Sequence, residues 1–333
     1  MLPLALFIYP PHAPRRANLT DTAPRVGMTQ GVDAILSVTS SQSNATTLWF
    51  RDERHAPCST HLSSRERLIP QRGEVWELDS GVLLYANPIQ LQIGKRFKQH
   101  VNLWEADEEI YWKRAFADVD AACSASASDA TCTVLDVGAA YGYYSILSRL
   151  HTPPAVQVHA FNPHPSFMRD MRQNLMLNRV DGSVCLHELA VSNQSNAKAA
   201  LSYSVASGIR QKGFHEHGKG TALPVNTTSL DEWAAAAAPW LLPGAAAPLA
   251  FLLVKLDIEG AAELALKGAW RLMSRATHIF IGIHDTAEWD AVERTFDSSR
   301  YEILVKSRSG DGDRRPNGAF IARARSFIAT PRL

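Results

Sequence analysis

The chain of 333 residues has little net charge and few cysteines, and each shortage excludes a class of partner or site. With a formal net charge of +1, it lacks the basic surface that holds a phosphate backbone, so we expect no nucleic-acid partner. None of its four cysteines forms a C-x-x-C pair, which argues against a zinc site and a disulfide framework, and we predict no metal. Cys185 lies in a strand-like run, where a free thiol packs as a small hydrophobe. Cys123 and Cys132 are able to pair only in an oxidising compartment.

The N-terminus shows little sign of a targeting segment. Its apolar run, residues 2–9, is far too short to span a bilayer and lacks the basic start and cleavage site of a signal peptide. Membrane association is not indicated beyond this run, which is also compatible with a truncated signal or anchor. Asn-x-Ser/Thr sequons weigh slightly toward the secretory pathway, and they begin at Asn18, Asn44, Asn193 and Asn226. We leave the compartment open and favour a soluble, cytoplasmic protein slightly.

The composition divides the chain into three parts. Residues 1–74 are rich in Ser, Thr, Pro and Arg without clear periodicity, and we interpret them as an irregular leader. Residues 75–130 hold short alternating runs and then a helical pattern, which predicts a small β and helical extension. Residues 131–325 alternate between apolar runs and amphipathic segments, and we assign them to one main domain.

The alternation in the main domain predicts an α/β fold with a mostly parallel, seven-stranded sheet covered by helices on both faces. The last two strands have no long helix between them, so one of them should be antiparallel. The strand candidates are 133–137, 156–161, 184–190, 251–257, 278–284, 301–306 and 318–323.

Two helical patterns and one interruption complete this prediction. A helix should open at Pro165, and Leu266, Ala269, Trp270 and Met273 have the spacing of one helical face. Residues 191–250 break the pattern with a polar stretch, a strand-like run and an alanine run bounded by prolines. We interpret the alanine run as a short helix and a linker, because proline excludes a long continuous helix.

The stretch "TVLDVGAAYGYYSILSRL", residues 133–150, is a strand that ends in a glycine turn and opens a helix. Such a turn lets the backbone approach a ligand closely, and the first N–H groups of the helix can receive an anionic group. The G-x-x-x-G spacing matches neither the dinucleotide fingerprint nor a P-loop. The candidate cofactor-binding residues here are Asp136, Gly138, Ala139, Ala140, Tyr141 and Gly142.

Asn162 ends the second strand, twenty residues after Gly142. In open α/β sheets this is where a side chain holds the ribose of a nucleotide-like ligand. An acidic residue is usual there, but asparagine can still accept one hydrogen bond and donate another. We therefore predict that Asn162 contacts a ribose.

Six blocks of the chain form one ordered set: "VLDVGAAYGYYSI", "AFNPHPSFMRDMRQNLMLN", "ELAVSN", "TTSLDEW", "FLLVKLDIEGAAELALKGAW" and "HIFIGIHD". Taken together, in their order and spacing, they resemble the FkbM family of S-adenosylmethionine-dependent methyltransferases. The resemblance covers about two-thirds of the chain and implies a class I methyltransferase (Rossmann-like) fold, with S-adenosylmethionine as cofactor. It also implies that Ala190 contacts the cofactor. The chain departs from the family where it has Ala140 for Asn, Asn162 for Glu and Ala262 for Glu.

Methyl transfer to an alcohol needs a base or a metal to remove the hydroxyl proton, and the ends of the fourth and fifth strands supply candidates. Asp257 and Glu259 follow the fourth strand, and His284 and Asp285 follow the fifth. We predict His284 as the base, with Asp285 as its orienting partner or as the cap of the next helix. Asp257 or Glu259 would contact the cofactor or the acceptor, with Asp257 assigned to the cofactor and Glu259 to the catalytic group, unless they only cap a helix. We expect the acceptor to be a small molecule or a carbohydrate.

The sequence is also compatible with functions other than methyl transfer. A catalytically inactive, methyltransferase-like binding module would keep the fold without turnover. An NAD-dependent oxidoreductase is less favoured, because the turn spacing is wrong and no Tyr-x-x-x-Lys pair is found near a strand that carries a base. "NPHP" follows the second strand rather than the fourth, which argues against methylation of a nucleic-acid base. His215 and His217 form an H-x-H pair, which we interpret as a polar loop rather than a metal site.

Overall fold

The computed structural model describes residues 74–86, 105–124, 130–204, 210–212, 221–309 and 317–327. Apart from Glu74, the predicted leader lies outside the described residues, as does the His215 and His217 pair. Within these described ranges, no helix is long and apolar enough to cross a membrane.

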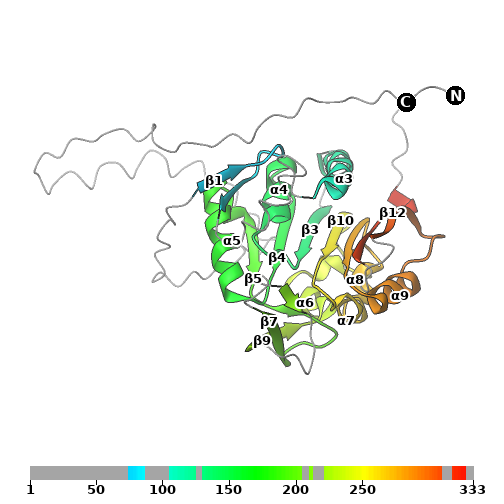
Figure 1. Ribbon diagram of the computed structural model, residues 1–333. Coiled ribbons are helices and arrows are strands. Elements are labelled where there is room, and N and C mark those ends of the chain that lie inside the picture. The colour runs from blue at the N-terminus through cyan, green and yellow to red at the C-terminus, as the bar shows by residue number, and fades with distance from the viewer. Residues whose placement is uncertain are drawn as a thin grey trace, which may run out of the picture.

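A seven-stranded sheet forms the centre of the molecule, in the order β12-β13-β11-β10-β3-β4-β5 (Figure 1). All pairs are parallel except those of β13, which runs antiparallel to both neighbours. The predicted mostly parallel sheet of seven strands is therefore confirmed. The strands are β3 (Thr131–Val137), β4 (Gln157–Phe161), β5 (Val184–His187), β10 (Leu249–Leu256), β11 (His278–Ile283), β12 (Tyr301–Ser309) and β13 (Asn317–Ala324).

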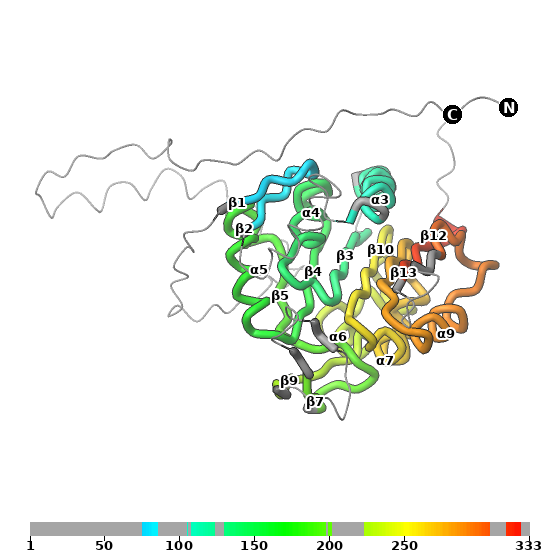
Figure 2. Tube along the Cα trace, in the orientation of Figure 1, coloured from blue at the N-terminus to red at the C-terminus, as the bar shows by residue number. Residues whose placement is uncertain are grey.

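Helices cover both faces of the sheet, as Figures 1 and 2 show. Successive residues of a strand point to opposite faces, so Val134 packs in one core cluster and Leu135 in the other. One face is covered by α3 (Ala106–Ser124), α4 (Tyr143–His151) and α5 (Pro165–Leu177). The other face is covered by α6 (Leu230–Ala237), α7 (Ala262–Lys267), α8 (Trp270–Met273) and α9 (Thr286–Thr295).

The single helix predicted across Leu266 and Met273 is wrong, because the chain breaks at Gly268 between α7 and α8. A Cβ at Gly268 would lie 2.2 Å from the carbonyl oxygen of Ser192, so glycine alone fits this close crossing. The carboxylate of Asp231 then accepts hydrogen bonds from the N–H groups of Arg271 and Leu272 at 3.0 and 2.8 Å. The break leaves Trp270 on the surface, 69% exposed, rather than on a buried face.

Smaller sheets flank the main one. The interrupted segment, predicted to hold one strand, forms a sheet of four, β6 (Ala190–Val191), β7 (Lys198–Ser204), β8 (Arg210–Lys212) and β9 (Thr221–Thr228), in the order β6-β9-β7-β8. The alanine run forms α6 as predicted and ends before Pro239. In the extension, β1 (Glu74–Glu77) and β2 (Leu83–Ala86) form a hairpin that docks on α5. The side-chain oxygens of Asn174 in α5 and of Asn178, its C-cap, accept the N–H groups of Tyr85 and Leu83 at 3.0 and 2.9 Å.

The cysteines form more crosslinks than the sequence predicted. Cys123, near the end of α3, is bonded to Cys132 in β3. Cys185 is also disulfide-bonded, so the prediction that it packs as a free thiol is wrong. The crosslink between Cys123 and Cys132 closes a short loop and holds the end of α3 against the first strand of the main sheet.

Candidate active site

Four neighbouring strands carry the predicted site residues at one edge of the sheet. The order β11-β10-β3-β4 brings together the carboxyl ends of four parallel strands. The glycine turn follows β3, Asn162 follows β4, Asp257 follows β10, and His284 follows β11. Ligands of open α/β sheets bind at such an edge, so the predicted residues meet where a ligand is expected.

The glycine turn, residues 138–142, is held by its backbone. The N–H groups of Gly138 and Ala139 both donate to the carbonyl of Phe161, at 2.9 and 3.1 Å, which binds the turn to the end of β4. A Cβ at Gly138 would lie 1.9 Å from the carbonyl oxygen of Asp257, so the turn and the end of β10 touch through their backbones. Glycine is therefore needed at position 138 for packing between two loops.

Tyr141 and Gly142 pack against α5, and Ala190 packs elsewhere. The ring of Tyr141 meets Phe167 edge to face with centroids 5.0 Å apart, and a Cβ at Gly142 would lie 2.6 Å from the side chain of Met171. Ala190 is buried in β6, in a small cluster with Leu201 and Val225.

Asp136 lies inside the core beneath the turn. Its Oδ2 accepts a hydrogen bond of 2.6 Å from the hydroxyl of Ser145, which joins β3 to α4. Burial raises the pKa of Asp136, and the opposing charge of Lys255 limits the effect. No side chain caps the start of α4, so this hydrogen bond is the polar tie between the strand and the helix that follows the turn.

Ala140 adopts a left-handed backbone, with φ of 47°. This conformation costs a non-glycine residue roughly 1–2 kcal/mol, and the greater freedom of glycine in the unfolded chain offsets about 0.4–1 kcal/mol of any gain. We expect Ala140→Gly to raise the free energy of unfolding by up to ~1 kcal/mol, measured by urea denaturation. Ala139→Gly is the matched control, because Ala139 is buried at an ordinary φ and should lose stability. Equal changes in the two variants would contradict strain at Ala140.

Asn162 is buried, and only one of its two side-chain polar atoms forms a hydrogen bond within the described protein. Its Oδ1 accepts the N–H of His164 at 2.9 Å, which shapes the turn into α5. Its Nδ2 has no hydrogen-bond partner among the described residues. A buried donor without a partner costs free energy, and a ligand hydroxyl would satisfy it. The ribose of the expected cofactor presents such hydroxyls, so Asn162 fits the predicted role through its nitrogen.

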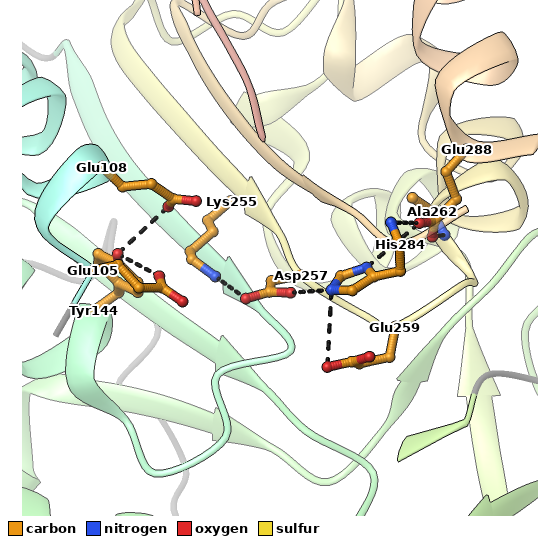
Figure 3. Close-up of polar contacts among 9 residues, drawn as sticks. All are labelled: Glu105, Glu108, Tyr144, Lys255, Asp257, Glu259, Ala262, His284 and Glu288. Carbon is orange, nitrogen blue, oxygen red and sulfur yellow. Dashed lines mark hydrogen bonds and ion pairs between the residues drawn. The ribbon is translucent and has the colours of Figure 1, made fainter. Parts of the chain in front are cut away.

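His284 is the centre of a group of charged side chains (Figure 3). Its Nε2 lies 3.4 Å from Oδ1 of Asp257 and 3.8 Å from Oε1 of Glu259, and its Nδ1 lies 3.4 Å from Oε2 of Glu288. Burial alone would lower the pKa of His284. The adjacent carboxylate of Glu288 and the charges of Asp257 and Glu259 outweigh burial and raise the pKa to about 9.

The carboxylate that lies beside Nδ1 of His284 belongs to Glu288, at 3.4 Å, and not to Asp285. Asp285 caps α9, because its Oδ1 accepts the N–H of Glu288 at 2.9 Å. Glu288 is 1% exposed, and its two oxygens accept the N–H groups of His284 and Ala262 at 2.7 and 2.8 Å. The sequence held a signal for this arrangement, since D-x-x-E at a helix start is typical of a capping box whose glutamate reaches back.

Glu259 has a left-handed backbone, with φ of 46°, directly before Gly260. Its side chain is about half exposed, unlike those of Asp257 and His284. Strained residues of this kind gather at functional sites, where the surroundings hold them. The Glu259 carboxylate points toward His284 (Figure 3).

Sequence reasoning missed Lys255 and the carboxylates of α3. Lys255 lies within β10, is 4% exposed, and its Nζ donates to Oδ2 of Asp257 at 2.8 Å and lies 4.8 Å from the ring centroid of Tyr144. Burial alone would lower the pKa of Lys255, but Asp257 and the nearby carboxylates of Glu105, Glu108 and Asp136 outweigh it and raise the pKa. A lysine inside an apolar run, "FLLVKLD", was the available signal.

Glu105 and Glu108 lie at the start of α3, across Lys255 from the histidine. Both accept from the hydroxyl of Tyr144, at 2.7 and 3.4 Å. Burial, followed by the charge of Glu105, raises the pKa of Glu108 to about 8. Glu108 therefore holds its proton at neutral pH, and a cation bound beside it would favour its charged form and lower its pKa.

No metal centre is found among the residues that the structure describes. Within them, no group of three or more His, Cys, Asp or Glu side chains is arranged to hold a metal ion.

A protein-family model described as "Methyltransferase FkbM domain" matches residues 136–303, half of the chain. No curated protein matches the chain. The solved methyltransferase FkbM from Methylobacillus flagellatus KT is 14% identical with a TM-score of 0.34, and the match covers 58% of this chain and 44% of that one. The O-methyltransferase TomG from Streptomyces achromogenes, solved with SAM, is 13% identical with a TM-score of 0.38, and the match covers 74% and 93%.

A third solved structure, a putative rRNA methylase from Clostridium thermocellum, is 10% identical with a TM-score of 0.37, and the match covers 59% of this chain and 88% of that one. The family match includes the glycine turn, Asn162, Asp257 and His284, and the sheet around them has the seven strands that the resemblance implied. The chain belongs to the FkbM family of S-adenosylmethionine-dependent methyltransferases.

Proposed function

We propose that the protein transfers the methyl group of S-adenosylmethionine to a hydroxyl of a small molecule or carbohydrate. The observation that carries the proposal is the family match across 136–303, which contains all four strand ends that form the site. The cofactor, when bound, supplies a methyl group on a positively charged sulfur. The protein must align an acceptor with that methyl and take up the hydroxyl proton.

The residues at the sheet edge divide this work. Asn162 offers its free Nδ2 to a ribose hydroxyl, and the carboxylates of Asp257 and Glu259 favour a cationic ligand over an anionic one. Glu259, the exposed carboxylate at the edge, is the acceptor contact. His284, held by Asp257 and Glu288, receives the proton once its ring is neutral. An inactive binding module would use the contact between Asn162 and the cofactor but not the proton transfer to His284.

Binding measurements on Asn162 variants test the cofactor site. We expect S-adenosylhomocysteine to bind the wild type, and Asn162→Leu to weaken it roughly tenfold, because a ligand hydroxyl loses its buried partner. Asn162→Asp is the matched control, since one oxygen still accepts the His164 N–H and the second oxygen, in place of Nδ2, can accept a hydrogen bond from a ribose hydroxyl, so most of the affinity should be retained. Titration calorimetry gives the affinities. Equal affinities in all three proteins would remove Asn162 from the site, and binding of NAD instead would overturn the proposed function.

Turnover separates a catalyst from a binding module. A screen of hydroxylated metabolites and glycans with cofactor labelled in the methyl group should find label in a hydroxyl-bearing acceptor. Cofactor binding without transfer to any acceptor of this kind would favour the binding module.

The crosslinks favour an oxidising compartment over the cytoplasm that the sequence favoured slightly. Disulfides persist where thiols are not continually reduced. Cys123, Cys132 and Cys185 are all bonded, and the sequon residues Asn193 and Asn226 are exposed. We expect protein taken from its own cells to resist thiol alkylation in denaturant until a reductant is added, as read by mass spectrometry. Alkylation of Cys123 and Cys132 without reductant would place the protein in a reducing compartment.

A further inference from the structure

Carboxylates face both nitrogens of the His284 ring. Asp257 and Glu259, from the loop between β10 and α7, face Nε2, and Glu288 of α9 faces Nδ1. One cation lies next to this group, because Lys255 of β10 binds the other carboxylate oxygen of Asp257. The balance around the ring is therefore three carboxylates against one ammonium, and it favours the protonated imidazole.

These carboxylates conflict with the role of His284 as a base in the proposed function. With a pKa of about 9, the ring carries a proton on both nitrogens at neutral pH. A protonated ring has no lone pair and cannot accept the proton of a hydroxyl. A base at this position needs an event that removes the proton before the chemistry begins.

The ligand site touches the same group of residues. Gly138 of the glycine turn meets the backbone carbonyl of Asp257, and the carboxylate of Asp257 meets His284. At Gly282, a Cβ would lie 2.7 Å from Oδ1 of Asp257 and 3.3 Å from Cε1 of His284, so no side chain separates the pair there. A ligand held by the turn is therefore one residue, Asp257, away from the histidine.

We propose that His284 rests as a protonated ring clamped by Asp257, Glu259 and Glu288, and that a cationic cofactor entering beside Asp257 drives its proton into solvent and so creates the base. The proposal rests on the proposed function. A second positive charge opposes the imidazolium and shares the carboxylate that stabilised it, and both effects weaken proton binding. The proton leaves His284 for water, and the neutral ring regains the lone pair that accepts the hydroxyl proton.

S-adenosylmethionine and S-adenosylhomocysteine provide a matched pair of ligands. They share the ribose, the base and the amino-acid end, and only the first carries a charge on sulfur. Proton release that follows the sulfur charge must therefore appear with the first ligand and be much smaller with the second. Glu108 is the competing source, because it also holds a proton near neutral pH and would release it beside a cation.

Titration calorimetry in two buffers of different ionisation enthalpy counts the protons released on binding. At pH 8 we expect the wild type to release roughly half a proton more with S-adenosylmethionine than with S-adenosylhomocysteine, which is the count that about tenfold weaker proton binding gives. The difference should vanish in His284→Gln, which still binds both ligands, and persist in Glu108→Gln. Equal counts in the wild type, or a difference that survives in His284→Gln and disappears in Glu108→Gln, would overturn the proposal.

A second measurement avoids the variants and covers the case in which one of them does not fold. Nuclear magnetic resonance follows the imidazole signals of the intact protein with pH, and the proton affinity of His284 should drop at least about tenfold with S-adenosylmethionine relative to S-adenosylhomocysteine. An unchanged affinity overturns the proposal while the binding heats still support a cofactor site. Absence of binding by either ligand overturns the proposed function and this inference with it.

Discussion

Replacing His284 by alanine should lower turnover by roughly a hundredfold or more while cofactor affinity stays near that of the wild type. The expected loss follows from the position of the ring at the end of β11, where it meets Asp257 and Glu259, and from the need of an alcohol for a proton acceptor. Steady-state kinetics with a labelled methyl group give turnover, and calorimetry gives cofactor affinity. Undiminished turnover in His284→Ala would exclude this histidine as the base.

The pH dependence of turnover gives a second test of His284 as the base. With a pKa of about 9 in the free protein, kcat/KM at low cofactor concentration should rise with pH until about 9. If the cofactor displaces the proton, kcat at saturating cofactor should level off at a lower pH. Asp285→Asn separates the cap from the orienting residue, because asparagine still caps α9 and the ring keeps Glu288. It should lose far less turnover than His284→Ala.

The same charge should also stabilise the fold in a defined pH window. The pKa of His284 is raised above its ordinary value of 6.5, so this stabilisation is complete below that pH and is lost as pH rises through about 9. His284→Gln should therefore cost ~2–3 kcal/mol of unfolding free energy at pH 6 and little above pH 10. A cost that does not change with pH would contradict the clamp of carboxylates.

Lys255→Met should lower the free energy of unfolding by about 3–5 kcal/mol, the usual cost of removing one partner of a buried ion pair. Methionine replaces the apolar stem of the lysine but leaves the carboxylates of Asp136 and Asp257 without their buried cation. Urea denaturation at pH 8 measures the loss.

The double variant Lys255→Met with Asp257→Asn is the control for this effect. It removes the charge on both sides of the pair and should recover part of the lost stability. A loss below about 1 kcal/mol in Lys255→Met would show that solvent already screens the pair. No recovery in the double variant would mean that Lys255 stabilises the fold through packing rather than through Asp257.

The strands of the main sheet were predictable because each is an apolar run buried on both faces. The predicted 251–257 and 278–284 lie within about two residues of β10 and β11 at each end. The glycine turn and Pro165 also gave correct boundaries, because backbone chemistry at such residues is local. Local patterns were thus enough to bring Asn162, Asp257 and His284 to one edge of the sheet.

Contacts between distant segments were not predictable in this way. No local pattern links Glu105, directly before α3, to Lys255 of β10, because the two lie far apart in the chain and meet only after folding. The break at Gly268 depends on the carbonyl of Ser192, which the spacing of apolar residues does not reveal. The protonated state of His284 depends on three carboxylates from two segments, so the residue was predictable as a candidate while its charge was not.

The backbone contact between Gly138 and Asp257 affects how mutational data on this protein should be understood. Any side chain at position 138 would collide with a carbonyl 1.9 Å away, whether or not a ligand is bound. A library selected only for folded protein should therefore keep glycine at 138, as would a library selected for methyl transfer. Loss of function on substitution of Gly138 therefore shows that two loops must pack together. A residue that is required only under selection for activity, such as Asn162 or His284, would instead be one that acts on the ligand.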